Sequence, residues 1–129
     1  MQNSIKEMSA QEAWLYLKDH KDSELIDVRT DLEWHNVGYP DLSLLDKQVH
    51  RISWAFAPEM QINVNFLDSL ENAVPNRDKV LLFMCKSGYR SGNAARFACD
   101  HGYKNCINIT NGFEGVGGWS SSLPITKGL

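Results

Sequence analysis

The stretch from Val80 to Ala98 constrains the fold of this chain more than any other. An unbroken apolar run, Val-Leu-Leu-Phe-Met over 80–84, leads into the loop Cys-Lys-Ser-Gly-Tyr-Arg-Ser over 85–91, and an alanine-rich segment follows. This order predicts a buried strand, a tight loop that opens on a cysteine, and a helix. Backbone N–H groups and the helix N-terminus would converge on the thiol of Cys85, and such surroundings stabilise a thiolate.

Strands and helices are expected to alternate along the rest of the chain. Strands are predicted at 24–28, 50–55, 79–84 and 105–109. Helices are predicted after the capping boxes that begin at Ser9 and Thr30, over 63–74, and over 91–101. The alternation predicts an α/β fold with a mainly parallel central sheet and helices on both faces. Ligands of such folds bind at the carboxyl ends of strands, and Cys85 follows the strand that we expect to be central.

Length and composition indicate one globular domain, residues 1–129, because 43% of the residues are hydrophobic and 22% are charged. The net charge of −3 and the pI near 5.7 give no basic footprint for nucleic acid or for an anionic membrane surface. The longest apolar run, 80–85, is far shorter than the ~20 residues that span a bilayer. Residues 1–7 lack the apolar core of a signal peptide. We therefore expect a cytosolic protein that binds neither nucleic acid nor membrane.

The cysteines and histidines show no metal-ligand spacing. Cys85, Cys99 and Cys106 are widely separated and form no C-x-x-C pair, so neither a zinc site nor a disulfide framework is expected. The four histidines are scattered, and no cofactor is expected. Cys99 is predicted to be buried. Cys99 or Cys106 would assist Cys85 as a resolving cysteine only if the fold brings them together.

The length of the cysteine loop discriminates between kinds of cysteine chemistry. Four residues separate Cys85 from Arg90, whereas cysteine phosphatases and similar arsenate reductases have five, and Met84 stands where a histidine would precede the cysteine. The shorter loop makes a tighter ring of N–H groups, which suits a terminal sulfur better than a tetrahedral phosphate. Sulfur transfer is therefore favoured, with phosphatase or arsenate reductase as the less favoured alternative.

Three segments resemble the single-domain rhodanese sulfurtransferases. The loop 85–91 matches the family's C-x-S-G-x-R-S form, and residues 25–34 match its L-x-D-V-R-x-x-x-E-[WYF] element. Asn111-Gly112-Phe113 is similar to the family's N-x-x-G-G-[FW] turn with a shortened lead-in. The resemblance covers a core of about 24–124. It departs at 35–40, where His-Asn-Val-Gly-Tyr-Pro stands in place of the family's G-H-I-P-G-A segment, and an insertion over 41–49 follows. The departure alters the expected shape of the site mouth.

The resemblance implies a rhodanese-like fold and sulfur transfer through a persulfide on Cys85. The donor would be thiosulfate or a persulfide, and the acceptor would be cyanide or a thiol. A sulfur-relay protein is a further expected partner. An alternative is a carrier without turnover that takes sulfur from a cysteine desulfurase. The substrate-binding residues would be those of the loop: Lys86, Ser87, Gly88, Tyr89, Arg90 and Ser91.

Each loop residue has an expected role. Lys86 would hold the sulfonate end of thiosulfate or remain solvated, and Arg90 would clamp an anionic substrate or tie the loop to a carboxylate. Ser87 and Ser91 are expected to donate hydroxyl hydrogen bonds to sulfur, although capping of the next helix is the favoured role of Ser91. Gly88 is expected to supply a positive φ or a close backbone approach. Tyr89 is expected to point outward at the entrance.

The residues outside the loop are given structural roles. Arg29 is predicted to pair with Glu33, and Asp27 to accept hydrogen bonds from nearby backbone; neither is expected to be catalytic. Trp34 is predicted to lie in the core. Three further side chains are expected either to border the site mouth or to pack in the interior: Trp54, Phe56 and Met60. Trp119 is expected to form a wall of the pocket.

Overall fold

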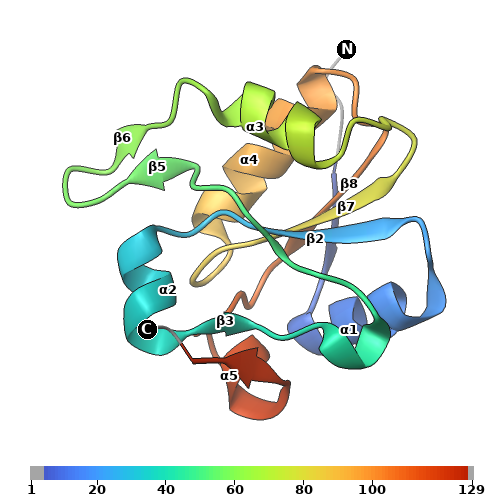
Figure 1. The fold of residues 1–129 in the computed structure, drawn as a ribbon, viewed down its shortest axis with the longest axis vertical. Helices are drawn as coiled ribbons and strands as arrows, with labels where there is room; N and C mark the ends of the chain where they lie inside the picture. The colour runs from blue at the N-terminus through green and yellow to red at the C-terminus, as the bar shows by residue number, and fades with distance from the viewer. Residues whose placement is uncertain (1–4, 128–129) are drawn as a thin grey trace.

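A five-stranded parallel sheet forms the centre of the computed structural model, which describes residues 5–127 (Figure 1). Its strands, in spatial order, are β1 (Lys6–Met8), β8 (Asn105–Ile109), β7 (Val80–Met84), β2 (Ser23–Asp27) and β4 (His50–Arg51). All four neighbouring pairs are parallel. The predicted parallel sheet is confirmed, and β7, the strand that leads to Cys85, is central with all five residues buried.

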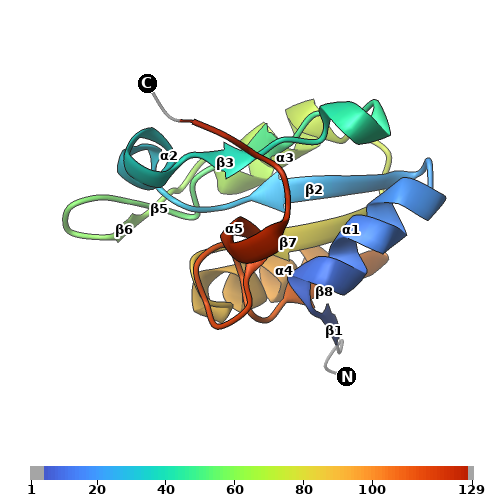
Figure 2. The same ribbon diagram turned by 90° about the horizontal axis from the view of Figure 1, so that it is seen from below.

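Helices cover both faces of the sheet, as the alternating pattern predicted. They are α1 (Ala10–Asp19), α2 (Asp31–Val37), α3 (Phe66–Ala73), α4 (Tyr89–Asp100) and the short α5 (Trp119–Ser122). One core cluster joins α3 and α4 to one face of the sheet, and a second joins α1 and α5 to the other. In Figure 2, α1 and α5 stand in front of the sheet and α3 and α4 behind it. Side chains of successive strand residues alternate between these two clusters, as the pleat requires.

Both predicted capping boxes are present. The hydroxyl of Ser9 accepts the backbone N–H of Glu12, and the Glu12 carboxylate accepts the N–H of Ser9. Thr30 and Glu33 form the same reciprocal pair at the start of α2. Because these bonds involve residues three apart, local sequence is enough to place both helix starts.

The segment after β4 differs from the expected strand over 50–55. The strand stops at Arg51, and β5 (Ala55–Phe56) then pairs antiparallel with β6 (Gln61–Ile62) as a hairpin. A second two-stranded sheet joins β3 (Tyr39–Pro40) to β9 (Ile125–Thr126), and a 3₁₀ turn, Ser43–Leu45, lies between β3 and β4. These elements are two or three residues long, too short for periodicity to reveal.

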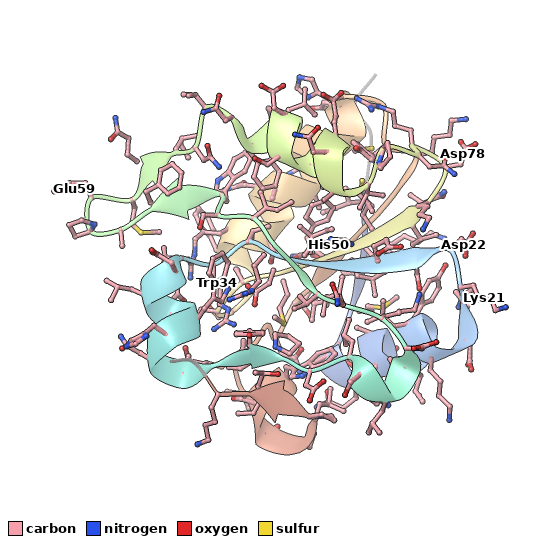
Figure 3. The ribbon with its side chains drawn as sticks, in the orientation of Figure 1. Lys21, Asp22, Trp34, His50, Glu59 and Asp78 are labelled. Atoms are coloured by element: carbon pink, nitrogen blue, oxygen red, sulfur yellow. The ribbon has the colours of Figure 1, made fainter. Side chains whose placement is uncertain are left out.

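Three predictions about burial are wrong. Trp34 is only half-buried, because α2 lies at the rim of the sheet and contributes no buried residue (Figure 3). Trp119 is fully buried in the core, where its ring packs edge-on against Trp14 and its indole N–H donates to Pro124, so it is not a wall of a site. Cys99 is half-buried rather than buried.

Within residues 5–127, no helix combines the length and apolarity needed to cross a membrane.

Candidate active site

Cys85 lies directly after the central strand β7, at the carboxyl end of the parallel sheet. Its side chain is only 1% exposed. The backbone N–H of Gly88 donates to Sγ at 3.1 Å, and the Oγ of Ser91 lies 3.2 Å from Sγ. Two different groups of the loop therefore contact one sheltered sulfur, at the place where parallel α/β folds bind ligands.

Gly88 makes the tight turn that brings the loop back over the sulfur. Its φ is +102°, and a Cβ at this position would lie 2.5 Å from the carbonyl oxygen of Thr110. The prediction of a positive φ and a close backbone approach is confirmed, since a side chain fits neither condition. Tyr89 follows at the start of α4 and is 79% exposed, which agrees with the expected outward orientation.

The predicted capping role of Ser91 is wrong. Gly88 is the N-cap of α4, so Ser91 lies inside the first turn rather than before it. The loop is tight enough for the helix to begin two residues earlier than expected. Because Ser91 is fully buried, its hydroxyl turns toward Cys85 and Asn108 instead of capping the helix.

Glu33 and Arg90 tie the cysteine loop to α2. Arg90 donates to both oxygens of Glu33, at 2.7 and 3.0 Å, in a bidentate ion pair. Burial acts to raise the pKa of Glu33, but the hydrogen bonds from Arg90 and Thr30 outweigh it and hold that pKa below its ordinary value. The same bond to Glu33 raises the pKa of Arg90. Of the two roles considered for Arg90, the tie to a carboxylate is the one observed.

Arg29 pairs with Asp27, and the predicted pairing with Glu33 is wrong. The Nε and Nη2 atoms of Arg29 bond the Asp27 carboxylate at 3.0 and 2.7 Å, and both side chains are fully buried. Residues two apart in extended chain point to the same side, which brings Arg29 back onto the last residue of β2. Asp27 also accepts the backbone N–H of Arg29 at 3.2 Å, as expected of a carboxylate that serves nearby backbone.

The turn predicted at 111–113 is hydrogen-bonded to the backbone of the cysteine loop. The N–H of Phe113 donates to the carbonyl of Cys85 at 2.9 Å, and the N–H of Glu114 donates to that of Lys86 at 2.9 Å. The guanidinium of Arg29 stacks over the Phe113 ring, 4.0 Å from its centroid. The three segments that carried the family resemblance therefore meet around one loop.

Lys86, Ser87 and Cys106 do not share the environment of Cys85. Lys86 and Ser87 are exposed, and the groups that contact Sγ are the Gly88 N–H and the Ser91 hydroxyl, so the hydrogen bond expected from Ser87 is not observed. Burial raises the pKa of the Cys106 thiol to about 12, which keeps it protonated at neutral pH. A protonated thiol is a poor nucleophile, so Cys106 is a poor candidate for the reactive residue. Among residues 5–127, no group of three histidine, cysteine or acidic side chains is arranged to hold a metal ion.

The aromatic segment after β4 divides between core and surface. Trp54 is half-buried and packs edge-on against Phe66 and Phe97, with ring centroids 5.1 and 5.5 Å apart. Phe56 and Met60 are 50% and 41% exposed on the β5–β6 hairpin. This hairpin and α2 lie beyond the carboxyl ends of β2 and β7, the side on which the cysteine loop emerges (Figure 1). Trp54 is therefore a packing residue, and the expectation of a place at the site mouth stays a prediction for Phe56 and Met60.

Asn108 is a site residue that sequence reasoning missed. It lies on β8 beside β7 and is 5% exposed. Its Oδ1 accepts the Ser91 hydroxyl at 2.6 Å, and its Nδ2 donates to the Gly88 carbonyl at 3.1 Å. The available signal was an amide within the strand Asn105–Ile109, whose other central residues are apolar. A buried polar residue in such a strand needs partners, and here they are two residues of the cysteine loop.

Comparison with known proteins agrees with this architecture. Residues 5–128 match the model of the STR4 middle domain. The uncharacterized protein RC0915 of Rickettsia conorii is 37% identical over 94% of this chain and 97% of its own length. The crystal structure of Rv0390 from M. tuberculosis is 32% identical, with a TM-score of 0.85, and the match covers 98% of this chain and 100% of that one.

A more distant neighbour shows the fold alone. The polysulfide-sulfur transferase homodimer of Wolinella succinogenes is 23% identical, with a TM-score of 0.72 over 95% of this chain and 79% of that one. The parallel sheet, the helices on both faces and these similarities lead to one assignment. The chain belongs to the STR4 middle domain family and has the rhodanese-like fold.

Proposed function

We propose that this protein is a sulfurtransferase that carries sulfane sulfur as a persulfide on Cys85. The observation that carries the proposal is the placement of one sheltered sulfur at the end of the central strand, 3.1 Å from the N–H of Gly88. The loop around it is closed by the Arg90–Glu33 ion pair, with only four residues between cysteine and arginine. The Wolinella neighbour, which shares the fold, is a polysulfide-sulfur transferase.

The chemistry is a two-step displacement that needs no cofactor. The Cys85 thiolate attacks the outer sulfur of thiosulfate; the S–S bond of the donor breaks, and sulfite leaves with the bonding electrons. A cyanide ion or a thiolate then attacks the outer sulfur of the persulfide. The Cys85 S–S bond breaks, thiocyanate or a new persulfide leaves, and the thiolate is restored. The N–H of Gly88, which donates to the sulfur, stabilises its negative charge throughout.

The loop residues divide into two groups in this proposal. Gly88 and Ser91 contact the sulfur, and Lys86 and Ser87 are exposed where the sulfonate of the donor would approach. Arg90 acts mainly through Glu33 by holding the loop closed, and Tyr89 borders the entrance. We also propose that the whole chain acts as one domain in the cytosol, where its three free cysteines remain reduced.

The test is thiosulfate:cyanide turnover, followed by thiocyanate formation, in wild type and Cys85→Ser. Wild-type turnover that disappears in Cys85→Ser supports the proposal. Cys99→Ser is the matched control, since this half-buried cysteine lies at the end of α4 away from the cysteine loop and its variant should retain activity. Equal activity in wild type and Cys85→Ser would overturn the proposal. Hydrolysis of an aryl phosphate without sulfur transfer would favour phosphatase chemistry instead.

A wild type that takes up persulfide sulfur but does not pass it to cyanide would point to a carrier. The burial of Cys85 favours this second candidate, because a sulfur that is 1% exposed is accessible only to an acceptor that fits the loop. Addition of a cysteine desulfurase and an acceptor protein would then distinguish relay between proteins from turnover of small molecules.

A further inference from the structure

The side chain of Asn108 has only one orientation that satisfies its neighbours. Its Oδ1 lies 2.6 Å from the Ser91 Oγ, and its Nδ2 lies 3.1 Å from the carbonyl oxygen of Gly88. With the amide reversed, two oxygens that can only accept would face each other at Gly88. Gly92 leaves the space for this amide, because a Cβ there would lie 3.2 Å from Nδ2. The acceptor atom of Asn108 is therefore the one that faces Ser91.

The position of the Ser91 hydrogen follows from this orientation. A hydroxyl has one hydrogen, and an amide oxygen has none to give, so the 2.6 Å contact uses the hydrogen of Ser91. The contact of 3.2 Å between Ser91 Oγ and Cys85 Sγ must then use the thiol hydrogen. In the protonated state the chain of donors runs from Cys85 to Ser91 to Asn108.

This order of hydrogen bonds, from Cys85 to Ser91 to Asn108, is impossible once the sulfur has lost its hydrogen. In a thiolate, lone pairs of Sγ and Ser91 Oγ would face each other in a buried place. Ser91 must turn its hydrogen toward the sulfur, and Asn108 Oδ1 then loses its donor. An acceptor left without a partner in the interior costs about 1–3 kcal/mol. Asn108 thus competes with the ionised sulfur for one hydrogen.

We propose that Asn108 is a positioning residue that sets the direction of the Ser91 hydroxyl and thereby the pH at which Cys85 becomes reactive. Its importance for sulfur transfer rests on the proposed function, whereas its effect on the reactivity of the thiol does not. Asn108 accepts the Ser91 hydrogen as long as Cys85 is a thiol. The Ser91 hydroxyl stabilises the thiolate of Cys85 once its hydrogen has turned toward the sulfur.

Neutral substitutions at Ser91 and Asn108 do not change the charged groups around the site. Arg90 interacts electrostatically with Cys85 and is paired with Glu33, and Asp27 is paired with Arg29. Glu7 is the register partner of Asn108 on β1, and Arg96 approaches Gly92 on α4. Lys86 is the neighbouring cation in the loop. A shift in the pH profile can therefore be assigned to Ser91 and Asn108.

A double-mutant cycle tests the proposal through the rate at which iodoacetamide alkylates Cys85 as a function of pH. Cys99→Ser and Cys106→Ser are included in every protein, so that only one thiol reacts. Asn108→Leu should move the midpoint of the profile to lower pH by roughly half a unit to one unit, since Ser91 is free to donate to sulfur. Ser91→Ala should move it to higher pH. In the Ser91→Ala background, Asn108→Leu should have no further effect.

The result that would overturn the proposal is the same midpoint shift from Asn108→Leu in both backgrounds, or a shift to higher pH in the presence of Ser91. Either would mean that Asn108 acts through Gly88 or through packing. Circular dichroism checks the fold of each variant, and Asn108→Val, which is smaller and β-branched, replaces Asn108→Leu if that protein does not fold. Because alkylation needs no sulfur donor, the cycle remains decisive even if no sulfurtransferase activity is found.

Discussion

The carboxylate of Glu33 is the residue-scale link between the cysteine loop and the rest of the site. It accepts two hydrogen bonds from Arg90 and two from Thr30, whose N–H and hydroxyl both lie 3.1 Å from Oε1. Glu33→Gln removes the charge but keeps the shape, so Arg90 is left half-buried without its anion. We expect unfolding free energy to fall by about 1–3 kcal/mol, measured by urea denaturation, and sulfur transfer to fall with it.

The control for Glu33→Gln is Asp78→Asn. Asp78 pairs with Lys104 at 2.9 Å, but both side chains are about 70% exposed, and Asp78 lies at the amino end of β7, opposite the end that carries the cysteine loop (Figure 3). An exposed pair of this kind contributes little to stability, because water and salt screen the two charges. Equal losses of stability in the two variants would show that the Arg90–Glu33 bond does not hold the loop.

Residue-scale contacts were the least predictable from sequence. Arg29 and Glu33 are four apart, which suggested a pair, but Arg29 lies before α2 in extended chain and folds back onto Asp27. The partner of Glu33 is 57 residues away. Only the tertiary fold sets that distance, as it sets the contact of Asn108 with Ser91.

Gly88 is the decisive position at the scale of elements, because it joins β7 to α4. Gly88→Ala would place a Cβ against the Thr110 carbonyl in a backbone conformation that costs alanine about 1–2 kcal/mol by itself. We expect a loss of stability clearly above that range, together with loss of sulfur transfer. Thermal unfolding and turnover measure the two effects.

Gly102→Ala is the matched control for Gly88→Ala. Gly102 also has a positive φ, +96°, but its Cβ would meet only the flexible side chain of Arg77 at 3.5 Å. This variant should lose about 1–2 kcal/mol and keep its activity. A Gly88→Ala protein as stable and active as Gly102→Ala would contradict the account of the turn.

Elements were predictable where their signals are local. The capping boxes, the apolar strand β7 and the short segment 105–109 each carry their own pattern, and all three are observed. The start of α4 was misplaced, because Ser91 is a good N-cap residue in sequence while the turn at Gly88 begins the helix earlier. The pairings of β1, β3 and β9 depend on distant partners and left no local signal.

Across the whole molecule, Glu24 connects three parts of the sheet. Its carboxylate contacts His50 of β4 at 2.8 Å and Lys79, just before β7, at 2.7 Å. The hydrogen bond from His50 has the largest effect and lowers the pKa of Glu24. Burial opposes it, and the interaction with Lys79 lowers the pKa further, so that it falls from 4.5 to about 2. A folded-state pKa below the unfolded one means that the ionised carboxylate stabilises the folded state.

The stability contributed by Glu24 should therefore be complete above pH 4.5 and be lost as the pH falls toward about 2. Glu24→Gln should lower stability at neutral pH and flatten the decline of stability in this acidic window, measured by urea denaturation at a series of pH values. Glu59→Gln, at the exposed tip of the β5–β6 hairpin, is the control and should follow wild type (Figure 3). If the stability of Glu24→Gln fell as steeply with decreasing pH as that of wild type, this prediction would be contradicted.

The architecture of the molecule was predictable because alternating strands and helices have few ways to pack. Cys85 could be placed at the carboxyl end of a central strand for the same reason. The rim of the site could not be predicted. It consists of α2 and the β5–β6 hairpin, whose positions depend on contacts between segments far apart in sequence, such as the Arg90–Glu33 ion pair and the bond from the Trp54 N–H to the Val28 carbonyl.

The most direct test of the central claim is the mass of the intact protein after incubation with thiosulfate, followed by peptide mapping. We predict a gain of one sulfur atom, located on Cys85 and removed by reductant or by cyanide. Cys85→Ser should show no gain, and Cys99→Ser should show the wild-type gain. A wild-type protein that gains no sulfur, or that gains it on Cys99 or Cys106, would contradict the account.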